Sequence, residues 1–225
     1  MTYVTPLPTL PRRSLEGLHS TLLGGNLDSK EVERAKDGQK ADFPEGIEEC
    51  GTDALRFALC AYTTQARDIN LDIKRVVAYR HWCNKLWNAI KFAMMNLPDG
   101  FVPSSEAELE AARPSYPLAS QWILSKLNGA VSAVVTAMEA YDFATSTQKL
   151  YAFWQYDLCD VFIELMKPVM ARDNAEAGAA EAKLATRNTL WTCLETGLRL
   201  LHPFMPFVTE ELWQVRLRCC KPATV

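Results

Sequence analysis

The sequence predicts an all-α protein, and three observations support this fold class. Apolar residues recur at helical spacing along most of the 225-residue chain. Capping residues and prolines mark the ends of these helical stretches. No sustained alternation of period two, which would indicate a strand, is present. Because the links between the main helices are short to moderate, we expect the helices to pack as an antiparallel bundle.

The N-terminal part is expected to be an irregular linker with short helices. Residues 1–13 contain three prolines and no apolar run, so we expect them to be disordered. Ser14 is suited to cap a short helix that ends before residues 24–26. Asp28 is suited to cap a second helix, which is rich in charged residues and should be exposed.

The main helices follow from apolar spacing and from caps. Asp72 and Asp142 each precede a helical run and are suited to cap it. Pro168 is expected to break or kink the helix that it ends. Residues 98–116 are acidic and contain prolines, which indicates a surface loop. We expect the five main helices over residues 52–65, 72–96, 117–141, 143–166 and 181–201, and a short last helix after Thr209.

The helix over residues 72–96 has two different faces. At 100° per residue, one face gathers the positions suited to packing: Tyr79, Cys83, Leu86, Ile90, Ala93 and Leu97. A polar, basic stripe with one aromatic ring lies about a quarter turn away. It consists of Arg80, Asn84, Lys85, Trp87, Asn88 and Lys91. Taken alone, the stripe is most simply a solvated helix face with one or two buried asparagines.

Composition limits the classes of function. The net charge is −3, but residues 72–97 hold five Lys and Arg against one Asp, so positive charge is concentrated there. Seven cysteines without a C-x-x-C pair predict buried, reduced thiols. No signal peptide and no apolar run of membrane-spanning length is visible. We therefore expect a soluble, cytoplasmic protein with no membrane partner.

The residues themselves indicate no catalytic or metal site. His19, His81 and His202 do not lie at metal-ligand spacing, and His202 before a proline better suits a helix end. No Gly-rich phosphate loop and no nucleophile elbow is present. Asp157 and Asp160 lie at helical spacing and suit a solvated or capping role. No residue is therefore assigned to catalysis, to a metal or to a cofactor.

Several segments together resemble the valyl-tRNA synthetases, which are class I aminoacyl-tRNA synthetases. Their order and spacing match the part of those enzymes downstream of the catalytic domain, and the resemblance covers roughly residues 14–214. The segment GQKADFP at 38–44 looks like the eukaryotic cytosolic form. The other segments are PEGI at 44–47, GTDALRF at 51–57, RDINLD at 67–72, YRHWCNKLWNA at 79–89, YDF at 141–143, DLCD at 157–160 and LHPFMPFVTEELW at 201–213.

The resemblance implies a division of the chain and a partner. The bundle would be of the class I synthetase anticodon-binding type, and its partner would be tRNA(Val). An assembly with other synthetases or with an elongation factor is also compatible with the family. The resemblance divides the chain into a non-matching leader at 1–13, a junction with the catalytic domain (stem-contact region) at 14–66, the anticodon-binding helical domain at 67–214 and a divergent tail at 215–225.

The sequence also departs from that family. The signatures His-x-Gly-His and Lys-Met-Ser-Lys-Ser of the nucleotide site are missing, and so is the editing domain. We therefore interpret the chain as a fragment that does not activate valine by itself. The ATP and Mg²⁺ used by the full-length family are not expected to bind here.

The resemblance turns the stripe into a candidate contact surface. Lys and Arg would contact phosphate, and Asn and aromatic groups would contact bases. Arg56, Arg67 and Asp68 are expected to form a structural ion-pair set at the domain junction. The alternative is a helical protein-interaction fragment without RNA binding. The expected tRNA contacts are Arg80, Asn84, Lys85, Asn88 and Lys91, with Trp87 as a stacking or packing ring.

Overall fold

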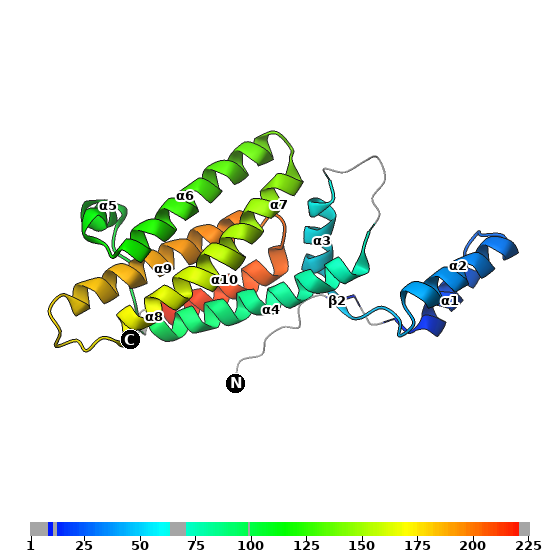
Figure 1. Ribbon diagram of the computed structural model, residues 1–225, viewed down its shortest axis with the longest axis horizontal. Helices are drawn as coiled ribbons and strands as arrows, with labels where there is room; N and C mark the ends of the chain where they lie inside the picture. The colour runs from blue at the N-terminus through cyan, green and yellow to red at the C-terminus, as the bar shows by residue number, and fades with distance from the viewer. Residues whose placement is uncertain (1–8, 11–12, 64–70, 99, 221–225) are drawn as a thin grey trace.

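The computed structural model describes residues 9–10, 13–63, 71–98 and 100–220, and of residues 9–10, 106 and 215–220 it describes the backbone alone. Within these ranges the protein is a helical bundle with a projecting N-terminal hairpin (Figure 1). The all-α prediction is thereby confirmed. The bundle is formed by α3 (Thr52–Ala61), α4 (Ile73–Asn96), α6 (Leu118–Glu139), α7 (Phe143–Ala152), η2 (Phe153–Phe162), α8 (Ile163–Ala171), α9 (Ala179–Leu201) and α10 (Pro206–Cys220).

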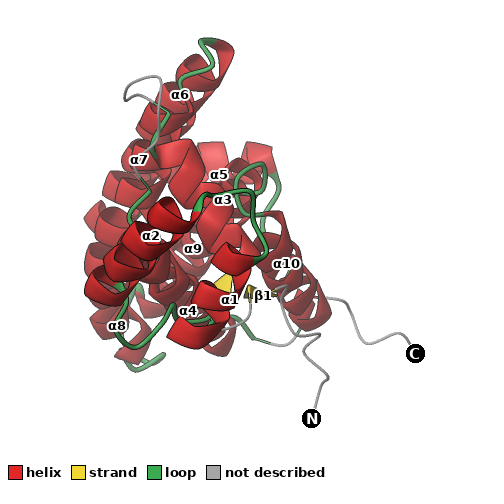
Figure 2. Ribbon diagram, turned by 90° about the vertical axis from the view of Figure 1, so that its right-hand side faces the viewer, coloured by secondary structure: helices red, strands yellow, loops and turns green. Residues whose placement is uncertain are grey.

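The N-terminal hairpin consists of α1 (Leu15–Leu23) and α2 (Ser29–Asp42), as the caps predicted. The Ser14 hydroxyl accepts the backbone N–H of Gly17, and the Asp28 carboxylate accepts two backbone N–H groups of the first turn of α2. The two helices lie side by side, away from the bundle (Figure 1). Figure 2, viewed from their side, places them in front of the bundle.

The expectation of disorder for residues 1–13 is wrong where the structure describes them. Strand β1 (Thr9–Leu10) pairs antiparallel with β2 (Cys50–Gly51). Arg13 and Ile47 exchange two backbone hydrogen bonds of 3.1 and 2.9 Å. Backbone pairing across about forty residues leaves no local apolar pattern in the sequence, so sequence reasoning missed it. The remaining residues of this segment lie outside the described residues.

The long helix α4 matches its prediction closely. The Asp72 carboxylate accepts the backbone N–H of Lys74 at 2.9 Å, as expected of a cap. Trp82, which was not among the predicted packing positions, is also buried. The half-buried Tyr79 packs against the core, and the other predicted core positions are buried: Cys83, Leu86, Ile90, Ala93 and Leu97.

The segment expected as a surface loop contains a helix. Helix α5 (Glu106–Ala112) is followed by the 3₁₀ turn η1 (Arg113–Ser115). A capping box starts α5, because Ser105 and Glu108 satisfy each other's backbone N–H groups. The Ser-x-x-Glu spacing was visible in the sequence and indicates this helix start. The prediction of a surface loop over 98–116 is therefore wrong for residues 106–115.

The other helix ends differ from prediction by small amounts. The run expected over 143–166 continues to Ala171 as α7, η2 and α8, and η2 is a π-helix. Pro168 lies inside α8, which continues to Ala171, so the expected break at this proline is wrong. Helix α3 ends at Ala61, before residue 65. Helix α10 starts at Pro206, an N-terminal position that suits proline, and reaches residue 220 rather than being short.

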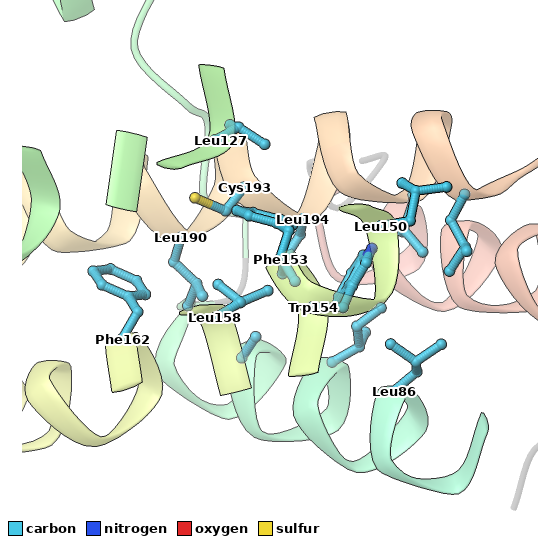
Figure 3. Packing of buried hydrophobic residues seen from close by; sticks show 14 of the residues in the cluster. Leu86, Leu127, Leu150, Phe153, Trp154, Leu158, Phe162, Leu190, Cys193 and Leu194 are labelled. Atoms are coloured by element: carbon cyan, nitrogen blue, oxygen red, sulfur yellow. The ribbon is translucent and has the colours of Figure 1, made fainter. Parts of the chain in front are cut away.

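The core is centred on the π-helix and on α9 (Figure 3). The side chain of Trp154 is fully buried, and its indole N–H donates to the Gly197 carbonyl at 3.4 Å. A Cβ at Gly197 would lie 2.8 Å from the Trp154 ring, so only glycine allows this approach. The buried side chains around this contact come from five helical segments, α4, α6, α7, η2 and α9: Leu86, Leu127, Leu150, Phe153, Leu158, Phe162, Leu190, Cys193 and Leu194.

The prediction of reduced thiols is confirmed for the cysteines whose side chains are described. All five of these are free, and four are buried. Burial raises the pKa of Cys83 to about 12 and that of Cys159 to about 11. The side chains of Cys219 and Cys220 lie outside the described residues. Within the described ranges, no helix combines the length and the apolar character that a membrane span needs.

Candidate nucleic-acid interface

The structure places all six predicted contact residues on one side of α4. We call Arg80, Asn84, Lys85, Trp87, Asn88 and Lys91 the α4 polar face. Asn84, Asn88 and Lys91 are exposed, whereas Arg80, Lys85 and Trp87 are half-buried. The alternative of an asparagine buried between helices is therefore wrong for both Asn84 and Asn88. Both residues are exposed and can therefore meet a polar partner from solvent.

Arg80 is anchored at the junction with the N-terminal region. Its guanidinium donates to the Asn84 side-chain oxygen at 3.4 Å. Its Cδ would lie 3.6 Å from a Cβ added to Gly51, so the side chain passes close to β2. These contacts hold the aliphatic part in place while the charged head stays partly exposed.

Lys85 has a partner within the protein. Its ammonium donates to the Asp160 carboxylate of η2 at 2.7 Å, and both side chains are partly exposed. Gln155 donates to the other oxygen of the same carboxylate at 3.2 Å. An exposed ion pair of this kind contributes only about 0–1 kcal/mol. Lys85 can therefore exchange its carboxylate for a phosphate at little cost, but it is a weaker candidate contact than the exposed Lys91.

Trp87 serves the core as well as the surface. It is half-buried and packs against the main hydrophobic cluster. One part of the ring is thus fixed by packing, which leaves only its remaining edge or face for a partner. This geometry lies between the two sequence-based alternatives, a stacking ring and a wholly buried ring.

The corner between α9 and α10 is held by hydrogen bonds from α3 rather than by an ion pair. The Asp53 carboxylate is buried and accepts the backbone N–H of Val208 at 2.7 Å and that of Phe207 at 3.4 Å. Arg56 donates to the carbonyls of Pro203 and Phe204 at 3.0 and 3.3 Å. Asp53 thus caps the start of α10. The structural role expected of Arg56 fits these contacts.

Two further expectations concern the same region. Arg67 and Asp68 lie outside the described residues, so the ion-pair set proposed for them stays a prediction. The His202 ring nitrogen Nδ1 lies 2.8 Å from the Thr209 hydroxyl, and His202 ends α9. This position agrees with a helix-end role. Asp157 and Asp160 each lie within ion-pair distance of a lysine, 3.6 Å from Lys126 and 2.7 Å from Lys85.

A groove between α3, α4 and α7 was not predicted from the sequence. It encloses about 510 Å³. Its lining includes Arg75, Gln148 and the three tyrosines Tyr79, Tyr151 and Tyr156. Sequence reasoning missed it because the lining residues come from four helical segments, α3, α4, α7 and η2, and because Tyr151 and Tyr156 do not share a face of an α-helix.

Comparison with known proteins identifies the family. A family model described as the anticodon-binding domain of tRNA ligases matches residues 120–224. The valine–tRNA ligase of Mus musculus is 55% identical to the chain over 211 residues, which are 94% of this chain and 16% of the relative. The mitochondrial valine–tRNA ligase 1 of Arabidopsis thaliana is 56% identical over the same share of the chain, which is 18% of the relative.

The chain belongs to the valine–tRNA ligase family. The relative from Schizosaccharomyces pombe, a valine–tRNA ligase, is 49% identical over 94% of the chain and 21% of its own length. The chain thus spans about a fifth or less of these valine–tRNA ligases. The matched anticodon-binding domain comprises α6 to α10, whereas the α4 polar face lies before it and within the region of identity to the ligases.

Proposed function

We propose that the chain binds tRNA(Val) and that the α4 polar face is part of the contact surface. The single observation that carries this proposal is the exposed row of Asn84, Asn88 and Lys91 on a helix packed against the anticodon-binding domain. Lysine supplies charge for phosphate, and the amides supply donors and acceptors for base edges. Arg80 and Lys85 extend the same surface. Each of them donates a hydrogen bond within the protein, and it would exchange this bond for one to the tRNA.

The proposal gives each part of the chain a role. Residues 67–214 would form the helical tRNA-binding domain and residues 14–66 the stem-contact junction, with the leader 1–13 and the tail 215–225 outside both. The relatives are named as ligases, and ligation of valine uses ATP and Mg²⁺ in this family. Since neither nucleotide-site signature occurs in the sequence, we assign no step of that reaction to this chain.

Binding of tRNA to the 225-residue chain tests the proposal directly. In a gel shift at about 50 mM salt, a tRNA carrying a valine anticodon should bind the wild type. Lys91→Gln should weaken binding severalfold, because an exposed phosphate contact is lost. Arg113→Gln is the matched control, since it removes one positive charge next to α5, on the far side of the bundle from α4. Absence of any shift at low salt would refute the proposal.

A protein-interaction role is the second candidate. The α1–α2 hairpin projects from the bundle and exposes Leu23 and, just after it, Leu27. Such a hairpin suits contact with another protein, for instance within an assembly of synthetases or with an elongation factor. A chain that binds no tRNA but co-purifies as a stable complex through this hairpin would favour this role.

We also propose a cytoplasmic location, which follows from the cytosolic form that the sequence resembles. Relatives with the word mitochondrial in their names occur at comparable identity. Cell fractionation, followed by detection of the chain with an antibody, distinguishes a cytoplasmic from a mitochondrial location. Recovery with mitochondrial markers alone would contradict the cytoplasmic proposal.

A further inference from the structure

A ladder of tyrosine rings lines the groove between α3, α4 and α7. The ring centroids of Tyr79 and Tyr151 lie 6.1 Å apart at 77°, and those of Tyr151 and Tyr156 lie 5.9 Å apart at 78°. Both contacts are edge-to-face, the arrangement that aromatic pairs prefer. Tyr79 and Tyr151 are half-buried, whereas Tyr156 is 57% exposed at the solvent end of the ladder. The ladder therefore presents one supported aromatic ring to a ligand.

The ladder crosses from α7 into the π-helix, since Tyr151 belongs to α7 and Tyr156 to η2. Tyr151 and Tyr156 are five residues apart, which would place them about 140° apart around an α-helix. In a π-helix the hydrogen bonds join residues five apart, so such residues share a face. Gln155 and Asp160 show the same spacing and are hydrogen-bonded at 3.2 Å. The rare backbone geometry of η2 thus holds Tyr156 beside the groove, and π-turns occur frequently at functional sites.

Arg75 supplies the positive charge of the groove. Its guanidinium carbon lies 4.6 Å from the Tyr62 ring centroid and 6.0 Å from that of Tyr79. Stacking fixes the plane of the guanidinium while the side chain remains exposed. Among the described residues, no carboxylate forms an ion pair with Arg75. None of the residues that line the groove in the described part is acidic.

The other polar groups of the groove suit the binding of a nucleotide. Gln148 and Thr145 of α7 contribute an amide and a hydroxyl to the lining of the groove. Burial raises the pKa of Tyr151, so its phenol stays neutral and can donate a hydrogen bond. Lys85 and Asp160, which lie near Tyr151, form an ion pair in which the two charges neutralise each other. The groove volume of about 510 Å³ is in the range of small-ligand sites.

We propose that this groove binds one unpaired nucleotide of the bound tRNA. The base stacks on Tyr156, the adjoining phosphate contacts Arg75, and Gln148 meets the base edge. Sequence-tolerant recognition of unstacked nucleotides uses this combination of an aromatic ring, an arginine and an amide. The inference rests on the proposed tRNA binding but concerns a surface separate from the α4 polar face.

Paired substitutions distinguish stacking from other effects. Tyr156→Ala should weaken binding of the tRNA by about five- to hundredfold, the range for loss of one base stack. Tyr156→Phe keeps the ring and should bind within about twofold of the wild type, since only the hydroxyl is lost. Arg75→Gln should weaken binding and reduce the slope of log K against log salt by about 0.7. Arg113→Gln should leave both quantities unchanged.

The results separate this inference from the proposed function. If the wild type binds tRNA and Lys91→Gln weakens binding while Tyr156→Ala binds like the wild type, the groove site is refuted and the proposed function stands. If the wild type binds no tRNA, both are refuted. A Tyr156→Phe variant as weak as Tyr156→Ala would contradict stacking.

A second measurement does not depend on variants. When 4-thiouridine-substituted tRNA is cross-linked to the wild-type chain, cross-links should map to Tyr151 or Tyr156 by mass spectrometry. Cross-links confined to other helices would overturn the assignment. Circular dichroism of each variant should match the wild type, since Tyr156 and Arg75 are exposed and contribute little to the core.

Discussion

The contact between Gly197 and Trp154 shows how strongly a single residue constrains this bundle. Gly197→Ala would place a methyl group 2.8 Å from the Trp154 ring, and the fully buried indole has no room to move. We expect a loss of about 1–3 kcal/mol in the free energy of unfolding, as for other overpacked cores. Urea unfolding of the wild type and of Gly197→Ala measures this loss of free energy.

Gly129 provides the matched control for this substitution. It also lies inside a helix, α6, but a Cβ there meets nothing within 4 Å. Gly129→Ala should therefore stabilise the protein by about 0.5–1 kcal/mol through helix propensity alone. Equal effects of the two substitutions would show that the close approach at Trp154 does not exist in solution.

Asp53 gives the stability a defined pH dependence. Burial raises the pKa of this carboxyl above its usual 3.8, although the N–H groups of Val208 and Phe207 oppose the shift. The folded state then binds the proton more tightly than the unfolded state does. The contribution of Asp53 to stability should therefore fall as pH rises from below 3.8 through the raised folded-state pKa.

The variant Asp53→Asn isolates this effect, because its amide oxygen can still accept an N–H but does not titrate. The stability of the wild type minus that of Asp53→Asn, from urea unfolding at several pH values, should decrease as pH rises through the acid range. An increase with pH would mean that the hydrogen bonds at the start of α10 dominate over burial, which contradicts the expected direction.

Residue positions on one helix could be predicted from the sequence, but contacts between helices could not. The helical period correctly separated the buried positions of α4 from the exposed Asn84, Asn88 and Lys91. The pairing of Lys85 with Asp160 joins residues 75 positions apart, and no local pattern encodes it. The same holds for the Arg56 contacts with the corner before α10.

At the scale of elements, side-chain caps were the most predictable feature. The caps Ser14, Asp28, Asp72 and Asp142 all accept backbone N–H groups of the helices that they precede. A cap is a local interaction over two or three residues, so the sequence contains all the information needed.

Removal of the α4 cap should therefore be costly. Asp72→Ala should lower the free energy of unfolding by about 0.5–2 kcal/mol, because the N–H of Lys74 loses its acceptor. Asp72→Asn should lie within a few tenths of a kcal/mol of the wild type, since asparagine caps as well as aspartate does. Thermal or urea unfolding of both variants checks the expectation, and an Asn variant as unstable as the Ala variant would contradict the capping role.

The π-helix could not be predicted from the sequence. The apolar residues of 153–162 fit an α-helical pattern, and no residue in this range marks a change in the hydrogen-bond spacing. The tyrosine ladder depends on this backbone, so the candidate nucleotide groove was invisible until the helices were placed in space. Helix α5, in contrast, was missed although its capping box stands in the sequence.

At the scale of the whole molecule, the bundle brings two candidate contact surfaces together. The α4 polar face and the tyrosine groove share α4, which carries Arg75 near its start and Lys91 near its end. A helix of 24 residues is about 36 Å long, so one nucleic acid molecule can contact both surfaces. Because the net charge is −3, this binding would rely on local positive charge rather than on the charge of the whole chain.

The salt dependence of tRNA binding tests the central claim most directly. The affinity of the wild type and of the double variant Arg80→Gln/Lys91→Gln should be measured between about 50 and 200 mM salt. If the α4 polar face contacts tRNA phosphates, the slope of log K against log salt should become shallower by about 1.4–1.8, which corresponds to two lost phosphate contacts. An unchanged slope, with binding as tight as that of the wild type, would contradict the claim that the α4 polar face binds tRNA.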